Sequence, residues 1–320
     1  MKPERMQHKV LITEFIDESA LLAFPPDVQV TYAPKLVDQR SELLEQVQDY
    51  DALIVRNRTQ VDRELLQQAA RLKAIGRLGV GLDNIDLKHC DDLNIQVLPA
   101  TGANTRSVAE YVIAATLLTT RRAFASTPEI LAGAWPRPAL GQGGEIEGRT
   151  LGLIGFGAIA QATAQLSRAL GMRVIAYDPF QTEASFVAAA VESCSLESCL
   201  SRSDVLSLHL PLTADTRSLI NAQRISLMRK GAILINTARG EVVELEPLVK
   251  ALNSGHLSAA VIDVFDSEPP SPALLKTLQG CENLTLTPHI AGVTAEANQR
   301  VSLMTVQNVV HALKEAKTDG

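Results

Sequence analysis

A histidine near the C-terminus stands where acid–base chemistry could take place. In residues 284–292, LTLTPHIAG, a segment with the alternation of a β-strand stops at Pro288, and His289 follows directly. Histidine is the side chain that most readily gains and loses a proton near neutral pH. A lone histidine is more often structural than catalytic, so its role depends on the residues that accompany it.

Further ionisable residues follow predicted strands in the same part of the chain. Arg239 ends the apolar run in INTARGEVV, His209 ends LSLHLP, and VIDVFDSEPP carries Asp263 and Glu268 just past its strand. Each alone could be a solvated loop residue, but ligands of open α/β sheets bind beyond the carboxyl ends of strands. An arginine binds a carboxylate through two hydrogen bonds, and a glutamate beside a histidine fixes its tautomer and stabilises its charged form. Arg239, Glu268 and His289 therefore have the chemistry needed to oxidise an alcohol next to a carboxylate.

A glycine-rich segment predicts a dinucleotide site. In LGLIGFGAIAQATAQLSRALGMRVIAYD a strand runs into Gly155 and Gly157, a helix opens, and a second strand ends at Asp178. Gly155 permits the tight turn, Gly157 lets the backbone approach a pyrophosphate, and Ala160 allows close packing of helix on strand. Phosphates bind the free N–H groups of the helix N-terminus. Asp178 would accept hydrogen bonds from ribose hydroxyls and repel a 2′-phosphate, and DPFQTEASF contains no Arg or Lys, so NAD is predicted rather than NADP.

The elements that must position these residues alternate along the chain. Short apolar runs such as KVLITEF, DALIVR and IQVLP alternate with amphipathic helical segments, and a second such series runs from TLGLIGFG to NLTLTPH. This alternation is typical of βαβ units, which build parallel sheets covered by helices. The strands are too many for one small sheet. The predicted fold class is therefore α/β, with two doubly wound parallel-sheet domains.

The join between the two series predicts a discontinuous first domain. Residues 104–122 form one long predicted helix, and a Gly/Pro-rich stretch separates it from the second series. A final helix after His289 has no strand behind it, and we expect it to pack back on the first domain. The second domain would then be inserted into the first, with hinges near Ala100–Ala103 and Pro288–Gly292 and with His289 facing the cleft. The expected limits are 1–101 with 290–320 for the substrate domain and 102–289 for the nucleotide-binding domain.

Composition excludes several other classes of protein. The chain has 320 residues, 46% of them hydrophobic, and a formal net charge of −6, which argues against nucleic-acid and anionic-membrane partners. Its four cysteines form no C-x-x-C pair and no metal-ligand spacing, as in reduced cytosolic proteins. No signal-peptide segment is found, and the most apolar stretch, VAEYVIAATLL, is too short to span a bilayer. We expect a soluble cytoplasmic protein that binds no metal.

Six segments carry a resemblance to a known family. GRLGVGLDNID, NTRSVAEYV, GFGAIA, INTARGEVV, DVFDSEPP and TPHIAG follow one another in the order seen in the D-isomer-specific 2-hydroxyacid dehydrogenases, particularly their phosphoglycerate-dehydrogenase-like branch. ITEFIDE and GRLGVGLDNID…PATGAN are more similar to sulfolactate dehydrogenases than to typical phosphoglycerate enzymes. The resemblance covers nearly the full chain. It implies a Rossmann nucleotide-binding domain inserted into a flavodoxin-like substrate domain, NAD as cofactor, and a homodimer.

The resemblance also implies roles for individual residues. The catalytic arginine, glutamate and histidine of the family fall on Arg239, Glu268 and His289. Its NAD contacts fall on Gly155, Phe156, Gly157, Ala158, Ile159, Asp178, His209, Pro211, Thr216, Thr237, Ala238, Arg239, Asp263, His289 and Gly292. Its substrate contacts fall on Arg56, Asn57, Leu78, Gly79, Val80, Arg239 and His289. Two positions depart from the family pattern, because Ala160 replaces its third glycine and Asp266 stands where relatives often have another residue.

A mechanism follows from these roles. The substrate carboxylate would lie on the backbone N–H groups of Gly79 and Val80, and Arg239 would hold the carboxylate and the C2 oxygen. His289 would take the hydroxyl proton as hydride leaves C2 for the nicotinamide, and would return it in the reverse direction. Glu268 would support the charged imidazole, and Asp263 would orient the nicotinamide carboxamide.

The substrate is predicted less sharply than the reaction. Arg56 matches a position that binds a second anion in phosphoglycerate-type relatives, which predicts a substrate such as 3-sulfolactate or 3-phosphoglycerate. Whether Arg58, Arg77, Trp135 and Arg137 touch substrate is left open. Two alternatives are a reductase of hydroxypyruvate or glyoxylate and an NAD-sensing protein related to transcriptional corepressors. Because the sequence ends at Gly320, we expect no feedback inhibition by serine through a further C-terminal domain.

Overall fold

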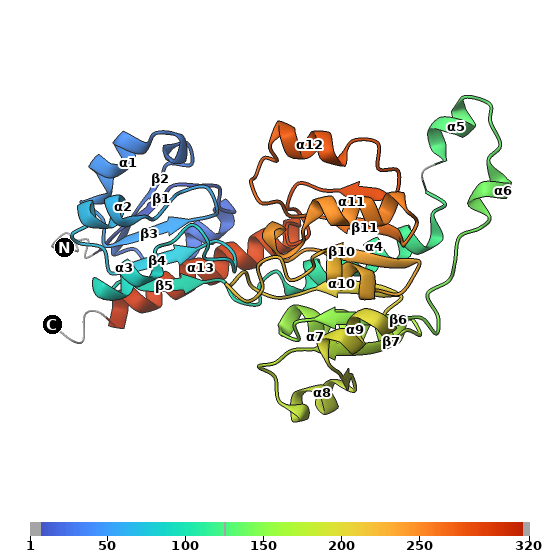
Figure 1. Ribbon diagram of the computed structural model, residues 1–320. Helices are drawn as coiled ribbons and strands as arrows, with labels where there is room; N and C mark the ends of the chain where they lie inside the picture. The colour runs from blue at the N-terminus through green and yellow to red at the C-terminus, as the bar shows by residue number, and fades with distance from the viewer. Residues whose placement is uncertain (1–7, 125, 316–320) are drawn as a thin grey trace. The chain divides into compact units, whose positions relative to one another are not determined.

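The chain folds into two compact α/β units. The computed structural model describes residues 8–124 and 126–315 (Figure 1). Unit 1 comprises residues 1–104 together with 293–320, and unit 2 comprises residues 105–292. The fold class predicted from the alternation of elements is confirmed. The limits predicted for the two domains stay a prediction.

Unit 1 is built on a five-stranded parallel sheet with the strand order β2-β1-β3-β4-β5, which is the flavodoxin-like order. The strands are β1 His8–Ile12, β2 Val28–Tyr32, β3 Ala52–Val55, β4 Ala74–Arg77 and β5 Gln96–Pro99. The helices are η1 Glu18–Ala23, η2 Leu36–Asp38, α1 Arg40–Val47, α2 Arg63–Gln68, α3 Leu87–Asp92 and α13 Ala295–Glu315. The last helix, α13, packs on this sheet through buried residues that include Val306 and Val309. Its approach is close, because a Cβ added at Gly76 of β4 would lie 2.6 Å from Val309 Cγ2.

Unit 2 is built on a seven-stranded parallel sheet with the order β12-β11-β10-β9-β6-β7-β8. Its strands are β6 Thr150–Ile154, β7 Arg173–Tyr177, β8 Glu192–Ser193, β9 Val205–Leu208, β10 Ala232–Asn236, β11 Leu257–Ile262 and β12 Leu284–Leu286. Its helices are α4 Thr105–Arg121, α5 Thr127–Leu131, α6 Arg137–Leu140, α7 Ala158–Ala169, α8 Glu183–Ala189, α9 Leu196–Arg202, α10 Ala222–Leu227, η3 Gly240–Val242, α11 Leu245–Asn253 and α12 Pro272–Leu278. The strand order reverses between β6 and β9, and ligands of doubly wound sheets bind at such a switch point.

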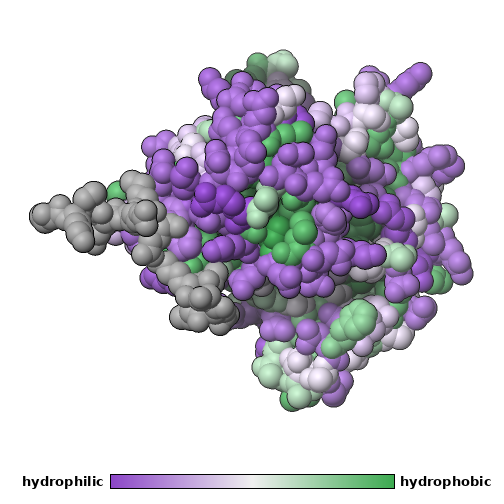
Figure 2. All heavy atoms as spheres, turned by 90° about the vertical axis from the view of Figure 1, so that its left-hand side faces the viewer, coloured by the Kyte–Doolittle hydropathy of each residue, from purple (hydrophilic) through white to green (hydrophobic). Residues whose placement is uncertain are grey.

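The central strands of unit 2 are apolar on both faces. Every residue of β6, β9 and β10 is buried, and the side chains separate into one core on each side of the sheet. Parallel strands covered by helices on both faces have this composition. Figure 2 views the chain from the left-hand side of Figure 1, where the elements of unit 1 are drawn, and on that face hydrophilic side chains predominate while hydrophobic ones form only small clusters. Within the part of the chain that the structure describes, no helix has the length and apolarity needed to cross a bilayer.

The described residues between Arg121 and Gly144, which include much of the Gly/Pro-rich stretch, form a projecting arm in unit 2 (Figure 1). Helices α5 and α6 lie on this arm, which extends away from the sheet of the unit (Figure 1). Its two ends meet where the Gly144 N–H donates to the Thr120 carbonyl oxygen at 2.9 Å. The arm exposes large hydrophobic side chains, with Phe124 71%, Leu131 82% and Trp135 73% exposed.

Candidate active site

The register of the unit 2 sheet brings most of the predicted NAD positions to one edge. The hydrogen-bonded ladders align one row of strand residues, namely Tyr177, Ile154, Leu208, Asn236, Ile262 and Leu286. The next residue of each strand emerges at the same carboxyl edge, and these residues are Asp178, Gly155, His209, Thr237, Asp263 and Thr287. Sequence analysis assigned cofactor roles to five of the six, and it missed Thr287.

The turn after β6 is shaped for the close approach of a phosphate. Gly155 has φ +87°, and a Cβ added there would lie 2.2 Å from the His209 carbonyl oxygen. A Cβ added at Gly157, the residue that caps α7, would meet nothing within 4 Å. Ala158 and Ile159 form the first turn of α7, where backbone N–H groups have no partner within the helix. This open helix N-terminus suits a pyrophosphate.

Phe156 and Asp178 form the wall of the same turn. The Phe156 side chain is fully buried and stacks on Phe186 with ring centroids 4.7 Å apart, so only its backbone can face a cofactor. The Phe156 N–H donates to Asp178 Oδ2 at 2.8 Å, and the Phe180 N–H donates to Oδ1 at 2.9 Å. These bonds orient the Asp178 carboxylate at the end of β7, where a ribose hydroxyl would donate to it.

A buried asparagine shapes the turn after β10. Asn236 is fully buried, its Nδ2 donates to the Arg239 carbonyl oxygen at 2.9 Å, and its Oδ1 accepts from the Ala238 N–H at 3.0 Å. The turn carries Thr237, whose buried Oγ1 has no hydrogen-bond partner among the described residues. The Arg239 Nη1 donates to the Ala238 carbonyl oxygen at 2.7 Å. Gly240 lies against the next loop, since a Cβ there would be 2.1 Å from the Phe265 carbonyl carbon.

His209 and the loop that follows it are held by local hydrogen bonds. The His209 Nε2 lies 2.9 Å from Ser207 Oγ, and burial lowers the pKa of His209 to about 4, so the ring is neutral at pH 7. Thr216 Oγ1 donates to the Pro211 carbonyl oxygen at 2.7 Å and accepts from the Thr213 N–H at 2.7 Å. The predicted positions Pro211 and Thr216 are therefore parts of one small loop.

The histidine and glutamate predicted to be catalytic form a direct pair. His289 Nδ1 lies 2.7 Å from Glu268 Oε2, with side chains 44% and 32% exposed. The carboxylate accepts the Nδ1 proton, which leaves Nε2 as the atom that exchanges a proton with a ligand. The other oxygen, Glu268 Oε1, accepts from the Phe265 N–H at 3.3 Å. His289 has φ +54°, a left-handed conformation that is strained for a residue other than glycine.

Asp263 has a different surrounding from the one we expected. It is 1% exposed, and its carboxylate accepts hydrogen bonds from Thr287 Oγ1 at 2.5 Å, the Ile290 N–H at 2.9 Å and the Ala291 N–H at 2.9 Å. The His289 N–H donates to the Asp263 carbonyl oxygen at 2.8 Å. The carboxylate thus binds the loop that carries His289 and ends at Gly292. A contact between Asp263 and the nicotinamide stays a prediction.

Five of the seven predicted substrate residues lie in unit 1, after β3 and β4, whereas Arg239 and His289 belong to unit 2. Arg56 and Asn57 follow β3 directly. Of the loop after β4, Leu78 is 2% exposed, so only its backbone can contact a ligand. Gly79 has φ +142°, and its N–H already donates to the Arg77 carbonyl oxygen at 2.8 Å. A carboxylate on the N–H groups of Gly79 and Val80 would therefore share or displace that hydrogen bond.

A buried glutamate in unit 1 was missed by sequence analysis. Glu14 is 4% exposed and accepts from the N–H groups of Arg56 at 2.8 Å, Arg58 at 3.2 Å and Thr59 at 2.9 Å. The signal that could have revealed it is a carboxylate near the end of the predicted strand KVLITEF, and in the structure Glu14 lies two residues past the end of β1 at Ile12. Asn84 adds Nδ2 bonds to the carbonyl oxygens of Arg56 at 3.2 Å and Thr59 at 2.7 Å. The loop that presents Arg56 is thus fixed from both sides.

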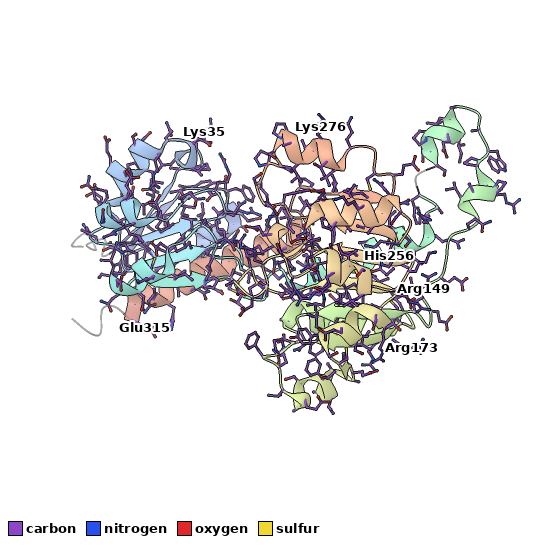
Figure 3. All side chains as sticks on the ribbon, viewed as in Figure 1. Lys35, Arg149, Arg173, His256, Lys276 and Glu315 are labelled. Carbon is purple, nitrogen blue, oxygen red and sulfur yellow. The ribbon has the colours of Figure 1, made fainter. Side chains whose placement is uncertain are left out.

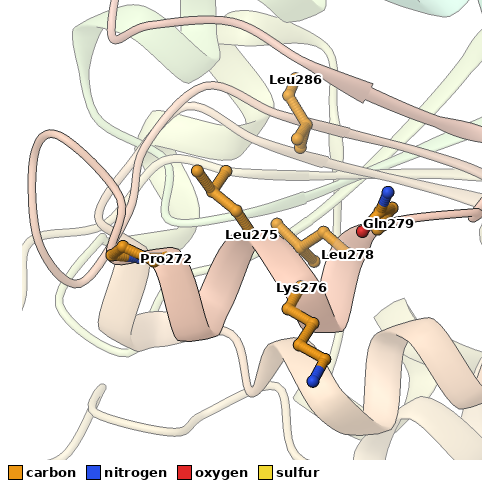
Figure 4. A pocket seen from close by; sticks show the side chains of 6 residues that line it. All are labelled: Pro272, Leu275, Lys276, Leu278, Gln279 and Leu286. Atoms are coloured by element: carbon orange, nitrogen blue, oxygen red, sulfur yellow. The ribbon is translucent and has the colours of Figure 1, made fainter.

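Two other features of unit 2, the amino edge of its sheet and a cavity beside α12, contain none of the predicted site residues. Arg149, Arg173 and His256, labelled in Figure 3, stand at the starts of β6, β7 and β11 and so belong to the opposite, amino edge of the sheet. A shallow cavity of about 570 Å³ lies between α12 and β12, and its lining is Pro272, Leu275, Lys276, Leu278, Gln279 and Leu286 (Figure 4). None of the predicted site residues lines this cavity, and Lys276 is the one ionisable residue in its lining, so it holds none of the predicted chemistry.

The residues at the carboxyl edge fit NAD. Gly157 leaves space for a pyrophosphate, and Asp178 offers a carboxylate for the ribose. Thr237 Oγ1, which no described residue hydrogen-bonds, provides a buried polar atom for a ligand. Together with the strand order of the sheet and the His289–Glu268 pair, they define a dehydrogenase that uses a nicotinamide dinucleotide.

Comparisons with known proteins identify the family. Residues 113–291 match the model of the D-isomer specific 2-hydroxyacid dehydrogenase, NAD binding domain. The chain is 49% identical to (S)-sulfolactate dehydrogenase of Chromohalobacter salexigens, over 95% of this chain and 98% of that protein. It is 37% identical to hydroxypyruvate reductase of Thermotoga maritima, over 96% and 99% of the two chains. The crystal structure of the TT0316 protein from Thermus thermophilus superimposes with a TM-score of 0.86 and 34% identity, covering 96% of this chain and 97% of that one.

The chain belongs to the D-isomer-specific 2-hydroxyacid dehydrogenase family. It is an NAD-dependent enzyme that transfers a hydride between NAD and C2 of a 2-hydroxyacid. The resemblance inferred from the six sequence segments is confirmed, and so are the cofactor and the enzymatic nature of the protein.

Proposed function

We propose that the enzyme interconverts a small D-2-hydroxyacid that carries a second anion on C3, with 3-sulfolactate favoured, and the corresponding 2-oxoacid. The observation that carries the substrate assignment is Arg56, which the buried Glu14 holds at the carboxyl edge of the unit 1 sheet. The similarity to a sulfolactate dehydrogenase at 49% identity supports it. 3-Phosphoglycerate is the second dianion of this class.

The stereochemistry of sulfolactate agrees with a D-specific enzyme. In lactate the carboxyl group outranks the methyl group, and the D isomer has the R descriptor. In 3-sulfolactate the sulfur-bearing CH₂ outranks the carboxyl group, so the same arrangement in space has the S descriptor. An (S)-sulfolactate dehydrogenase and a D-lactate dehydrogenase therefore remove hydride from carbons of the same handedness.

The proposed mechanism assigns one task to each residue of the carboxyl edge. Bound NAD supplies or accepts the hydride at C2. Gly157, Asp178 and Thr237 would hold the cofactor. Arg239 binds the substrate carboxylate and C2 oxygen, as an arginine does through paired hydrogen bonds. His289 Nε2 takes the hydroxyl proton in oxidation and returns it in reduction, and the Glu268 carboxylate at 2.7 Å stabilises the charged ring.

Arg56 is better placed than Arg58 to bind a second anion. The Arg56 guanidinium lies 5.8 Å from the centre of the Phe15 ring and donates from Nη2 to Asn298 Oδ1 at 3.2 Å. Burial lowers the pKa of Arg56, an effect that the Glu14 carboxylate offsets only in part, but an arginine stays protonated at neutral pH. Arg58 is more exposed, and its Nη2 is paired with Asp38. The Asn298 amide is neutral and does not cancel the positive charge of Arg56, so a sulfonate can bind to this charge.

A second candidate function is reduction of hydroxypyruvate or glyoxylate. The similarity to a hydroxypyruvate reductase supports it, and the catalytic residues would be the same. Such a substrate has no second anion, so Arg56 would contribute little.

The test is NADH oxidation against 3-sulfopyruvate, 3-phosphohydroxypyruvate, oxaloacetate, hydroxypyruvate, glyoxylate and pyruvate. We expect the wild type to prefer a dianion, and Arg56→Ala to raise the KM of that dianion about 10- to 100-fold, the effect of losing a charge-assisted hydrogen bond. Hydroxypyruvate should respond to the same substitution less than about threefold. Arg58→Ala is the control. Preference for a monoanion that Arg56→Ala leaves unchanged would contradict the dianion proposal and favour the reductase.

We also propose that the enzyme is a cytoplasmic homodimer. The exposed hydrophobic side chains of the arm, Phe124, Leu131 and Trp135, support the dimer, because a projecting apolar surface of this kind is usually covered by a partner.

A further inference from the structure

We propose that Tyr111 is a positioning residue for His289 and acts on it through Thr287 and Asp263. Tyr111 lies on α4 and belongs to none of the residues assigned above to substrate or cofactor. Its hydroxyl lies 2.5 Å from Thr287 Oγ1, and Thr287 Oγ1 lies 2.5 Å from Asp263 Oδ1. The inference rests on the proposed role of His289 in proton transfer.

The chain of hydrogen bonds has one direction. A carboxylate only accepts hydrogen bonds, so the single hydroxyl proton of Thr287 points at Asp263. Tyr111 must then donate its own proton to Thr287 Oγ1. Burial of the phenol, with a contribution from the Asp263 carboxylate, raises the pKa of Tyr111, so its hydroxyl remains a donor at neutral pH.

The end of this chain is the backbone on both sides of His289. Asp263 Oδ1 accepts from the Ile290 N–H and Oδ2 accepts from the Ala291 N–H, both at 2.9 Å. The Asp263 carbonyl oxygen accepts the His289 N–H at 2.8 Å. Three consecutive N–H groups are thereby fixed on one residue, and between them His289 keeps its left-handed φ of +54°. Because this conformation is costly, the surrounding hydrogen bonds must enforce it.

Tyr111 connects helix α4 to the loop that carries His289, through its hydrogen bond to Thr287. Asp263 and Thr287 are neighbours at the sheet edge, whereas Tyr111 is 176 residues away from Thr287 in sequence and comes from a helix. Its ring packs against the buried core on one face of the unit 2 sheet, which orients the hydroxyl. The hydroxyl bond limits rotation of Thr287, and with it the position of Asp263. Proton transfer depends on the geometry of His289, so this contact should affect kcat more than binding.

Tyr111→Phe removes the hydroxyl and keeps the ring. The matched control is Tyr50→Phe, because Tyr50 donates to Thr31 Oγ1 at 2.9 Å in unit 1 and is also partly buried. We expect Tyr111→Phe to lower kcat about three- to tenfold, the usual effect of one hydrogen bond, with the KM for NADH unchanged. Tyr50→Phe should leave both constants at wild-type values. Equal kcat values for the two variants would overturn the proposal.

Variants of Thr287 test whether Tyr111 acts through it. Thr287→Val should lower kcat at least as much as Tyr111→Phe, and the double variant should fall no further, because the two residues belong to one chain. Thr287→Ser keeps the hydroxyl and should restore kcat to within about twofold of wild type. Reductions that multiply in the double variant, or a serine variant as impaired as the valine variant, would show that Tyr111 does not act through the Thr287 hydroxyl.

Hydrogen exchange of the Ile290 and Ala291 amides provides a reading that needs no substrate. Both amides should exchange faster in Tyr111→Phe and Thr287→Val than in the wild type, whereas their exchange rates should be unchanged in Tyr50→Phe. If Tyr111→Phe exchanged faster but kept the wild-type kcat, Tyr111 would hold the loop without affecting catalysis. If its exchange rates were also those of the wild type, the whole proposal would be wrong. If the wild type turned over no 2-oxoacid at all, the proposed function would fail, and the exchange rates would still decide whether Tyr111 holds this loop.

Discussion

Each ionisable residue at the carboxyl edge of unit 2 is held by hydrogen bonds from its neighbours. Asp178 accepts two backbone N–H groups, Asp263 accepts three donors, and Glu268 binds His289 and a backbone N–H. Sequence analysis could predict that these residues share an edge, because each of them follows a strand. It could not predict the donors, since the hydroxyl of Tyr111 reaches Thr287 only once a helix packs on the sheet.

His209 should make the stability of the folded chain depend on pH. Its folded pKa is about 4 against an ordinary value of 6.5, so between these values the unfolded chain binds a proton that the folded chain does not. Stability is therefore lost as pH falls from about 6.5 towards about 4. His209→Gln should reduce the slope of the free energy of unfolding against pH by up to about 1.4 kcal/mol per pH unit. Urea unfolding between pH 4 and 7 measures it, and a slope identical to that of His311→Gln would contradict the assignment.

At the level of the elements, the register of the sheet does most of the positioning. One row of paired residues across six of the seven strands places the six loops that follow them at a common edge. The alternation of strands and helices in the sequence predicted this arrangement, since parallel βαβ units bring the carboxyl ends of their strands together. The loop that begins at Arg56 shows the limit of such patterns. A motif predicts the arginine, whereas the buried Glu14 that fixes its backbone depends on the packing of two strands.

Two glycines of the turn after β6 should respond differently to alanine. At Gly157, φ is −77° and the added Cβ meets no atom, so stability should be unchanged while the Kd of NADH rises at least about tenfold, because the methyl group would occupy the phosphate space. At Gly155 the positive φ and the His209 carbonyl oxygen at 2.2 Å should cost more than about 2 kcal/mol of stability. Gly231→Ala, with φ +82° and nothing within 4 Å, isolates the backbone cost. Urea unfolding and NADH titration by fluorescence measure these effects, and unaltered NADH affinity in Gly157→Ala would argue against this turn as the phosphate site.

On the scale of the whole molecule, the chain forms two parallel-sheet units, and its second unit carries an apolar arm. The return of the final helix α13 to the first sheet could be expected from sequence, because that helix has no strand behind it. The arm could be anticipated only as a Gly/Pro-rich interruption. Its hydrophobic side chains are exposed because α5 and α6 lie away from the sheet of unit 2, which the sequence pattern does not reveal (Figure 1).

The proposed dimer can be tested on this arm. Leu131 is 82% exposed, and if a partner covers it, Leu131→Asp should raise the dimer dissociation constant at least about tenfold, since a charge would be buried without a partner. Leu22→Asp is the control, because Leu22 is 88% exposed on η1 in unit 1. Sedimentation velocity over a range of concentrations measures both. A monomeric wild type, or equal behaviour of the two variants, would contradict a dimer formed through the arm.

The central claim is that His289 transfers the proton that accompanies hydride transfer at C2. Its most direct test is the steady-state reduction of 3-sulfopyruvate by NADH, catalysed by the His289→Gln variant. The control is His311→Gln, because His311 lies on the surface of α13, where it is paired with Glu315 at 3.1 Å. Deuterated NADH establishes that the chemical step is being measured. We predict that kcat falls by about 10²- to 10⁴-fold in His289→Gln, with the KM for NADH little changed, and stays at the wild-type value in His311→Gln. A loss of less than about tenfold in His289→Gln, with a full isotope effect on the wild-type rate, would contradict the account.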